Sequence, residues 1–252
     1  MATSYSPIVP KGLKHYFDVN DRNCVDATST NITGSVQGTS TKLNCLVSDL
    51  QMEAYDNTNT NMTFVQDKGG YCCDQVGTNS GYPGWRSTTT VGRVDDYTFV
   101  CWFKFNYGLD YQRAQNIYGG GFSAQTSFVI SWGGTSASHG VLRYPETGTD
   151  HNYNRTADYG GNDGNWHMFA STDTGGDGAQ STTVYIDGVS QGTTTSNASY
   201  DTPDTATRLT WGSWNVTYGN MGGKTNCYMY YERVLSASEI LQIYNQMKGR
   251  FQ

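Results

Sequence analysis

Apolar and polar residues alternate along much of this chain with the two-residue period of a β-strand. In the segment Tyr97–Phe105 the odd positions are aromatic residues or cysteine, whereas the even positions hold Thr98, Val100, Trp102 and Lys104. Successive side chains of a strand point to opposite faces, so this pattern predicts a strand with one strongly apolar face. Further strands are predicted over residues 13–19, 43–47, 50–55, 127–132, 140–144, 166–171, 182–187, 208–211 and 226–231.

One segment near the end of the chain has the pattern of a helix instead. Ser236 and Glu239 have the spacing of a capping box, and Leu235 and Ile240 occupy the two positions of a hydrophobic staple. An apolar stripe at helical spacing is formed by Ile240, Ile243, Tyr244 and Met247. We expect this helix to end at Gly249 and to dock on a sheet, because so short a helix is marginal in water.

The order of these elements predicts the fold class. Clusters of Gly, Asn and Asp separate the short strands, and no helical pattern intervenes between them. We therefore expect an all-β protein, a two-sheet antiparallel jelly-roll sandwich with one short C-terminal helix. Residues 1–11, which include Pro7 and Pro10, are predicted to be an extended N-terminal arm, and residues 12–252 a single domain.

The amino-acid composition indicates which classes of partner are unsuited to this protein. Of the 252 residues 36% are hydrophobic and 15% charged, and nineteen Tyr, nine Phe and six Trp supply large side chains for a sandwich core. The net charge of −6, without a Lys/Arg run, argues against a nucleic-acid partner. We also expect no membrane partner, because no apolar run is long enough for a span and no secretion signal is recognised at the start.

Six cysteines are an even number, which in a small secreted protein would suggest disulfides. In a chain long enough to build its own core and without a recognised signal, we expect reduced and mostly buried thiols. Cys72 and Cys73 are adjacent, so on a strand their side chains point to opposite faces. No Cys-x-x-Cys pair exists and the four histidines are scattered, which argues against a zinc site.

Four segments together resemble the concanavalin A-like and laminin G-like superfamily. They are Gly12–Asp18, Asn165–Ala170 with its Trp-His pair, Val184–Gly188 with its Asp-Gly turn, and Tyr230–Ile240. The resemblance implies the jelly-roll sandwich. Members of this superfamily occur among lectins, adhesion proteins, glycan hydrolases and surface proteins of phages and other virions, so the resemblance alone leaves the activity open.

We expect no enzymatic activity. Related glycan hydrolases are implied to carry two carboxylates at alternate positions of one strand, and such a strand is not recognisable here. The glutamates are Glu53, Glu146, Glu232 and Glu239, and none has a carboxylate two positions away on a predicted strand. No Ser, Cys or carboxylate stands at a sequence spacing that would make His167 a base, so a packing role is favoured for it.

The sequence offers candidate residues for two kinds of binding site, one for calcium and one for sugars. Many relatives are implied to hold calcium in loops at one edge of the sandwich, and the oxygen donors here would be Asp163, Asp173 and Asp177, although their spacing matches no fixed calcium motif. No cofactor is otherwise expected. Aromatic residues in predicted loops are candidates for stacking on sugar rings, and these are Tyr82, Trp85, Tyr153, Tyr159, Trp214 and Tyr218. The alternative is that several of them fold back as lids of the core or form subunit contacts.

These expectations combine into one leading hypothesis, a non-enzymatic structural protein of a virion surface. As a capsid decoration or fibre-associated domain it would be assembled in the host cytoplasm, contact capsid or fibre subunits through residues 1–11, and bind host-surface glycans through its loops. A homo-oligomer is compatible with this arrangement. The alternatives are a free carbohydrate-binding lectin and a glycan hydrolase whose carboxylates the pattern does not reveal.

Overall fold

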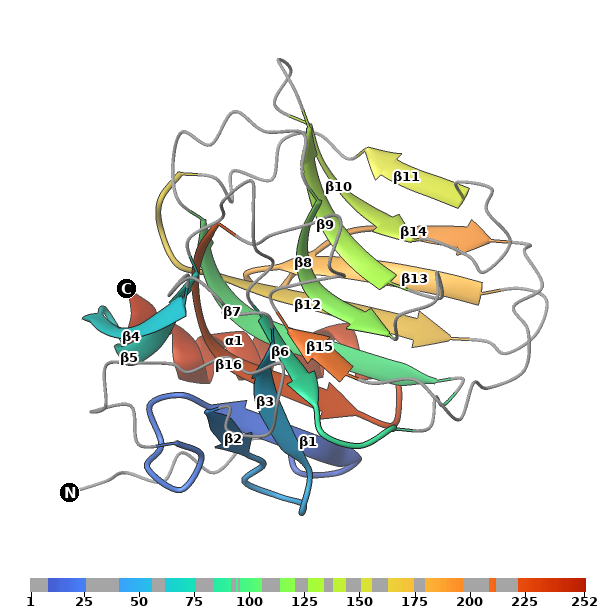
Figure 1. Cartoon of the computed structure of the whole chain (residues 1–252). Coiled ribbons are helices and arrows are strands. Elements are labelled where there is room, and N and C mark those ends of the chain that lie inside the picture. Colours follow the sequence, from blue (N-terminus) through green and yellow to red (C-terminus); the bar gives the residue numbers. More distant parts are fainter. Residues whose placement is uncertain are drawn as a thin grey trace.

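The protein is a β-sandwich made of two antiparallel sheets with a single helix at the C-terminal end of the described chain (Figure 1). The computed structural model describes residues 9–25, 41–55, 62–75, 84–91, 94, 96–105, 114–120, 127–133, 138–143, 151–155, 163–174, 180–196, 209–211 and 222–252. For the strands between 114 and 155 it describes the backbone only. The predicted fold class is confirmed.

Sheet A is built around a central pair of strands, β7 and β16. Its order is β14-β13-β12-β7-β16-β5-β4, and β1 joins beside the last part of β16 while β5 pairs with its first part. The strands of sheet A are β1 (Leu13–Asp18), β4 (Met62–Asp67), β5 (Gly70–Gln75), β7 (Tyr97–Phe105), β12 (His167–Thr174), β13 (Gln180–Ile186), β14 (Val189–Ser196) and β16 (Gly223–Tyr231).

Sheet B packs against one face of sheet A and has the order β11-β10-β9-β8-β15-β6-β3-β2. Its strands are β2 (Lys42–Asn44), β3 (Gln51–Tyr55), β6 (Gly84–Ser87), β8 (Ala114–Gly120), β9 (Ser127–Gly133), β10 (Ser138–Arg143), β11 (His151–Arg155) and β15 (Leu209–Trp211). Each strand predicted from the alternation corresponds to one of these, whereas β4, β5, β6, β8, β11 and β14 were not predicted. In β5 the run Gly-Tyr-Cys-Cys-Asp-Gln lacks an alternating pattern, which explains why sequence reasoning missed it.

The middle of sheet A is buried on both faces, and the alternation of β7 explains how. Phe99 and Phe103 belong to the inner core between the sheets, together with residues of sheet B such as Trp211. Val100 and Trp102 belong to an outer core under the helix. Cys73 lies in the inner core and Cys72 in the outer one, as their adjacency predicted; all six cysteine thiols are unpaired and five of these residues are buried.

The helix α1 (Ala237–Phe251) covers part of the outer face of sheet A. The predicted capping box is confirmed, since the Ser236 side chain accepts from the Glu239 backbone N–H and the Glu239 carboxylate accepts from the Ser236 backbone N–H. The prediction that the helix ends at Gly249 is wrong, because α1 continues to Phe251. The ring of Phe251 stacks on that of Trp102 with a centroid distance of 4.2 Å, and this packing holds the last turn on the sheet.

A buried ion pair fixes the same end of α1 to the first strand. The guanidinium of Arg250 donates two hydrogen bonds of 2.6 Å to the carboxylate of Asp18, and the two side chains are only 6% and 4% exposed. Arg250 also donates to the Asn226 side chain at 2.8 Å and to the Gly69 carbonyl at 2.9 Å. These contacts bring the β4–β5 turn, β16 and β1 together at the end of the helix. No helix in the described part of the chain is both long and apolar enough to cross a membrane.

Candidate functional site

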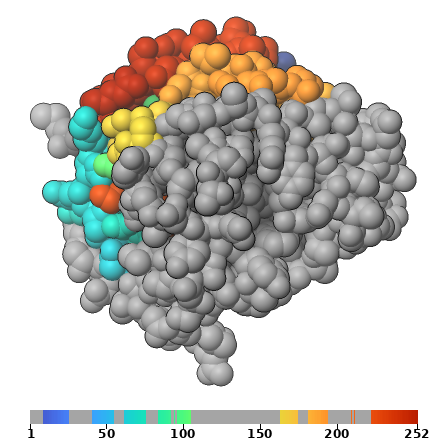
Figure 2. All heavy atoms as spheres, turned by 90° about the horizontal axis from the view of Figure 1, so that it is seen from above, coloured from blue at the N-terminus to red at the C-terminus, as the bar shows by residue number. Residues whose placement is uncertain are grey.

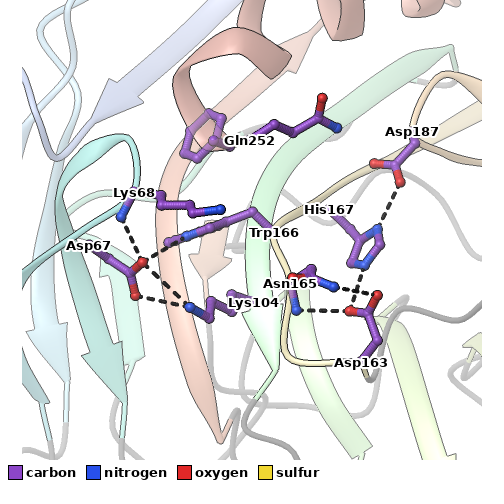
Figure 3. A pocket seen from close by; sticks show the side chains of 10 residues that line it. Asp67, Lys68, Lys104, Asp163, Asn165, Trp166, His167, Asp187 and Gln252 are labelled. Carbon is purple, nitrogen blue, oxygen red and sulfur yellow. Dashed lines mark hydrogen bonds and ion pairs between the residues drawn. The ribbon is translucent and has the colours of Figure 1, made fainter.

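An open cleft of about 390 Å³ lies beside the C-terminal end of α1 (Figure 3). Its walls come from the β4–β5 turn, β7, the segment leading into β12, the β13–β14 turn and the end of the helix. In Figure 2 the yellow residues leading into β12 adjoin the cyan β4–β5 hairpin on the rim below red α1. The lining residues are Asp67, Lys68, Lys104, Asp163, Asn165, Trp166, His167, Asp187, Phe251 and Gln252.

The turn between β13 and β14 supplies the first fixed group of the cleft. Asp187 and Gly188 have φ angles of 52° and 80°, which are the left-handed values of the two-residue hairpin turn that the Asp-Gly pair predicted. The Asp187 carboxylate accepts the backbone N–H of Met168 at 2.9 Å and contacts Nδ1 of His167 at 2.7 Å. The turn is thus fastened to the start of β12.

His167 lies between two carboxylates. Its Nδ1 contacts Asp187, and its Nε2 lies 3.0 Å from Oδ1 of Asp163, four residues earlier in the chain. Because carboxylate oxygens only accept, both ring nitrogens donate when both bonds are made, and the ring is then an imidazolium. Burial opposes the charged form, yet the hydrogen bonds to Asp187 and Asp163 outweigh it and raise the pKa of His167 above its ordinary value.

The segment Asp163–Asn165 forms the exposed rim beside this histidine. The Asp163 carboxylate accepts the backbone N–H and the side-chain amide N–H of Asn165, each at 2.8 Å. Partial burial raises the pKa of Asp163, but the bonds from Asn165 and His167 lower it further, so that the net pKa lies below the ordinary value. The Asp163 side chain remains 45% exposed, so its oxygens can also accept from a ligand.

Asp67 organises the opposite end of the cleft. Its carboxylate lies 3.2 Å from the ammonium of Lys104, contacts the ammonium of Lys224, and accepts the Lys68 backbone N–H at 2.6 Å. The indole N–H of Trp166 points to the same carboxylate at 3.5 Å. Burial of the carboxylate raises its pKa, but the bonds from Lys224, Lys68 and Lys104 prevail and lower the pKa to about 2.

The floor between these two ends is aromatic and largely closed. Trp166 is only 4% exposed, and its ring packs against Phe251 with a centroid distance of 5.1 Å. Figure 3 shows Trp166 and Asn165 between the Asp67 group and the His167 group. A ligand in the cleft therefore contacts polar rim groups, with the edge of an apolar floor beneath them.

The chemistry of this arrangement favours binding over catalysis. A general base needs a free lone pair within reach of a substrate proton, and His167 uses both ring nitrogens for carboxylates. Asp67 is charged and shared by two lysines, so it is not a proton donor at neutral pH. The groups of the cleft that a ligand can reach most readily are the exposed ones, which are Lys68, Asp163, Asn165 and Gln252.

The structure shows only part of the predicted aromatic platform. Trp85 is not a loop residue: it lies on β6, is 1% exposed in the inner core, and offers no face to a sugar, so this prediction is wrong. Tyr153 lies on β11, where the side chain is not described. The other four candidates lie outside the described residues, and they are Tyr82, Tyr159, Trp214 and Tyr218. A loop platform stays a prediction.

The predicted calcium ligands do not come together where they are described. Asp163 lines the cleft, whereas Asp173 is not in a loop: it lies near the far end of β12, is 1% exposed and accepts a hydrogen bond of 2.6 Å from Thr182. Asp163 contacts His167, and the rise of the strand from His167 to Asp173 is about 20 Å, so the two aspartates cannot share an ion. Asp177 is outside the described residues. Within the described ranges no group of three or more His, Cys, Asp or Glu side chains is arranged to hold a metal.

Sequence reasoning missed the partners of His167. Sequence spacing indicated no carboxylate that would make His167 a base, yet Asp163 and Asp187 both contact the ring, and by occupying both nitrogens they leave it no lone pair for that role. The spacing of Asp163 and His167, and the hairpin register that sets Asp187 beside Met168, were the available signals. The described glutamates are paired elsewhere: Glu53 with Arg86, Glu232 with Lys14 and Glu239 with Arg233. Glu146 lies outside the described residues.

Comparisons with known proteins identify structures of similar fold but no family for this chain. No family model matches the chain, and no curated protein matches it. Among solved structures, domain 4 of AbnA, a GH43 extracellular arabinanase from Geobacillus stearothermophilus, in complex with arabinotriose, is 14% identical with a TM-score of 0.59, covering 92% of this chain and 98% of that one. The botulinum neurotoxin serotype D binding domain is 10% identical with a TM-score of 0.58, covering 93% of this chain and 52% of that one.

The Trypanosoma rangeli sialidase is a third similar structure, 13% identical with a TM-score of 0.53, covering 98% of this chain and 36% of the sialidase. The chain thus spans about half of the neurotoxin binding-domain chain and about a third of the sialidase chain. At these identities the likeness shows the fold alone, a lectin-like β-sandwich. Domains of this fold occur here both in binding proteins and in enzymes, so the activity has to be argued from the cleft.

Proposed function

We propose that this protein is a glycan-binding domain without catalytic activity, and that the cleft at the end of α1 is its binding site. The observation that carries the proposal is that the cleft has little-exposed groups that hold its walls and exposed groups on its rim. The side chains of Asp67 and His167 are only 11% and 13% exposed and bond within the protein. Lys68, Asp163 and Asn165 are exposed, and although Asp163 and Asn165 bond each other at 2.8 Å, their side chains keep further lone pairs and an N–H for a ligand. Carboxylate and amide groups placed on a rim beside aromatic side chains suit the hydroxyl groups of a sugar.

The fold comparison is consistent with this proposal. The arabinanase domain, 98% of which this chain covers, is described in complex with arabinotriose, and the neurotoxin structure is described as a binding domain. Both descriptions belong to those proteins. They support a binding role for this chain as a proposal, to be tested on its own residues.

The proposal is tested by glycan-array binding of the purified protein and of Asn165→Ala. Asn165 is exposed on the rim, and we expect this substitution to weaken binding about three- to tenfold, the effect of one or two hydrogen bonds to a ligand. Asn44→Ala is the matched control, because Asn44 is an exposed asparagine on β2 of the other sheet. Equal binding by wild type and Asn165→Ala would place the site elsewhere, and absence of binding to every glycan would refute the proposed function.

The same preparation separates a binding domain from a glycan hydrolase. We expect no release of reducing sugar from any glycan that the array identifies. If sugar is released, the substitution Asp163→Asn decides whether the cleft is responsible, because Asp163 is its exposed carboxylate. Release that persists in Asp163→Asn would indicate a catalytic site among other residues.

A narrower version of the proposal places the domain on the surface of a virion, attached to capsid or fibre subunits through its N-terminal arm. Its support is the proline-bearing sequence of residues 1–11. Val9 is 6% exposed in the outer core and the Lys11 carbonyl accepts from Arg233, so an informative deletion stops at residue 8. Loss of particle incorporation with retained folding would support the narrower version, and unchanged incorporation would refute it.

A further inference from the structure

The cleft has two electrostatically different ends, which we name by their residues. The lysine end consists of Lys68, Lys104 and Asp67, with Lys224 immediately behind them. The aspartate end consists of Asp163, Asn165 and His167, closed by Asp187. Figure 3 shows the two groups on opposite sides of Trp166.

The lysine end holds more positive than negative groups. Three ammonium groups are present, and Asp67 is the carboxylate that Lys104 and Lys224 share. Asp74 is the next carboxylate: it lies opposite Lys224 in the register of β5 and β16 and does not line the cleft. The ammonium of Lys68 has no hydrogen-bond or ion-pair partner among the described residues, and its side chain is exposed on the rim.

Asp67 cannot neutralise a third cation. Its Oδ1 accepts from the Lys68 backbone N–H and contacts Lys104, and its Oδ2 contacts Lys104 and Lys224. The Asp67 side chain is 11% exposed, whereas that of Lys104 is 26% exposed. The accessible charge at this end is therefore carried by the ammonium groups of Lys68 and Lys104.

The aspartate end has the opposite character. Asp163 and Asp187 flank the single imidazolium of His167, so this end retains one excess negative charge while the ring is protonated. The exposed groups there are the Asp163 carboxylate and the Asn165 amide, both of which bind hydroxyl groups. An anionic group would be repelled from this end and attracted to the other.

We infer that the cleft selects acidic glycans, with the carboxylate or sulfate of a sugar residue beside Lys68 and Lys104 and the hydroxyl groups of the same or the next residue on Asp163 and Asn165. This inference rests on the proposed glycan binding and adds the class of sugar. The two ends fix the orientation of the ligand, because the reverse orientation would set its anion against Asp163. Since the lysines are on the rim, the attraction is screened by salt.

The test uses a glycan array that contains matched acidic and neutral members, with trigalacturonic acid and its fully methyl-esterified form as the defined pair for titration. We expect the acidic member of a pair to bind at least fivefold more tightly at low salt, and the preference to shrink as the salt concentration rises. Lys68→Gln should reduce affinity for the acidic ligands about three- to tenfold and affinity for the neutral ones by less, so that the acidic preference shrinks. Lys42→Gln, an exposed lysine on β2 of sheet B, is the charge-matched control.

The outcomes distinguish the inference from the proposed function beneath it. Binding with an acidic preference that is reduced in Lys68→Gln but kept in Lys42→Gln supports both. Equal binding of acidic and neutral members, or an acidic preference that Lys68→Gln leaves intact, overturns the inference and leaves glycan binding standing. No binding to any member overturns the proposed function itself.

Discussion

The outer face of sheet A has two parts that are built on the same strands. In one part α1 covers Val100 and Trp102 of β7 and seals them in an apolar core. In the other part, beyond the last turn of the helix, β7 and β16 present Lys104 and Lys224 instead. The position at which the helix ends thus decides where an apolar face becomes an open, charged cleft.

The two parts form the hydrogen bonds and ion pairs of their polar groups in different ways. In the covered part Arg250 and Asp18 are buried and bond each other in a fixed geometry. In the open part the ion pairs of Asp67 and His167 hold the walls in place, and the exposed side chains on the rim can be reached by a ligand. The covered part therefore carries stability, and we assign recognition to the open part.

The largest expected effect is the loss of the buried ion pair in the covered part. Arg250→Ala leaves the Asp18 carboxylate buried without its cation, and we expect the free energy of unfolding to fall by about 3–5 kcal/mol. Arg233→Ala is the matched control, because its pair with Glu239 is 24% and 29% exposed, and its cost should be about 1 kcal/mol or less. Urea unfolding measures both, and similar losses for the two variants would contradict the distinction.

A smaller effect is expected from Asp67→Asn in the open part. Removing the carboxylate charge leaves the ammonium groups of Lys104 and Lys224 close together, at a cost of about 1–3 kcal/mol near neutral pH. Because the pKa of Asp67 is lowered to about 2, its contribution is present above the ordinary value of 3.8 and is lost as the pH falls through about 2. Unfolding measured from pH 6 to pH 2 should show the two proteins converging; Asp21→Asn, in an exposed turn, should match wild type throughout.

A still smaller and pH-dependent effect is expected from His167→Gln, which keeps a polar side chain but does not titrate. The folded protein raises the pKa of His167, so its contribution is complete below the ordinary value of 6.5 and is lost as the pH rises through the raised value. The pKa of Asp163 is lowered, so the stability that its charge contributes is complete only above the ordinary pKa value of 3.8. We expect wild type to be more stable than His167→Gln by about 1–2 kcal/mol near pH 6, and we expect this difference to shrink at higher pH. A difference that stays constant with pH would contradict a protonated His167 ring in the folded protein.

The smallest effect on stability is expected from Lys68→Gln. The ammonium of Lys68 is exposed and forms no ion pair with the described residues, so the free energy of unfolding should change by no more than about 0.5 kcal/mol. Thermal unfolding of the variant checks this value. Unchanged stability would make the binding data on Lys68→Gln a measure of recognition, whereas a large loss would show that Lys68 is structural.

The covered part was largely predictable from sequence and the open part was not. Alternation in Tyr97–Phe105 and the capping box at Ser236 are local patterns, and both are confirmed. The continuation of α1 to Phe251 depends on stacking with Trp102, which no local pattern contains. Asp67 and Lys224 are 157 positions apart in the chain, so only the strand order of sheet A brings them together.

The burial of Trp85 was missed for a related reason. Pro83 and Gly84 precede it and favour a loop, whereas its position is set by pairing of β6 with β3 and β15. A short strand flanked by turn residues is recognised only when its partner strands are known. Local pattern therefore indicates which residues can form strands, and the register decides which of them meet.

The most direct test of the cleft as the binding site is an NMR titration that follows the six tryptophan indole N–H signals. The ligand is the tightest-binding glycan from the array, and Trp166→Phe assigns the signal of the residue beneath the cleft. The account predicts a saturable shift of the Trp166 signal, because its indole N–H points to Asp67, while the signals of buried Trp85 and Trp211 stay unchanged. An unmoved Trp166 signal at saturating glycan would contradict it, and a shift confined to Trp214 would move the site to the predicted loop platform.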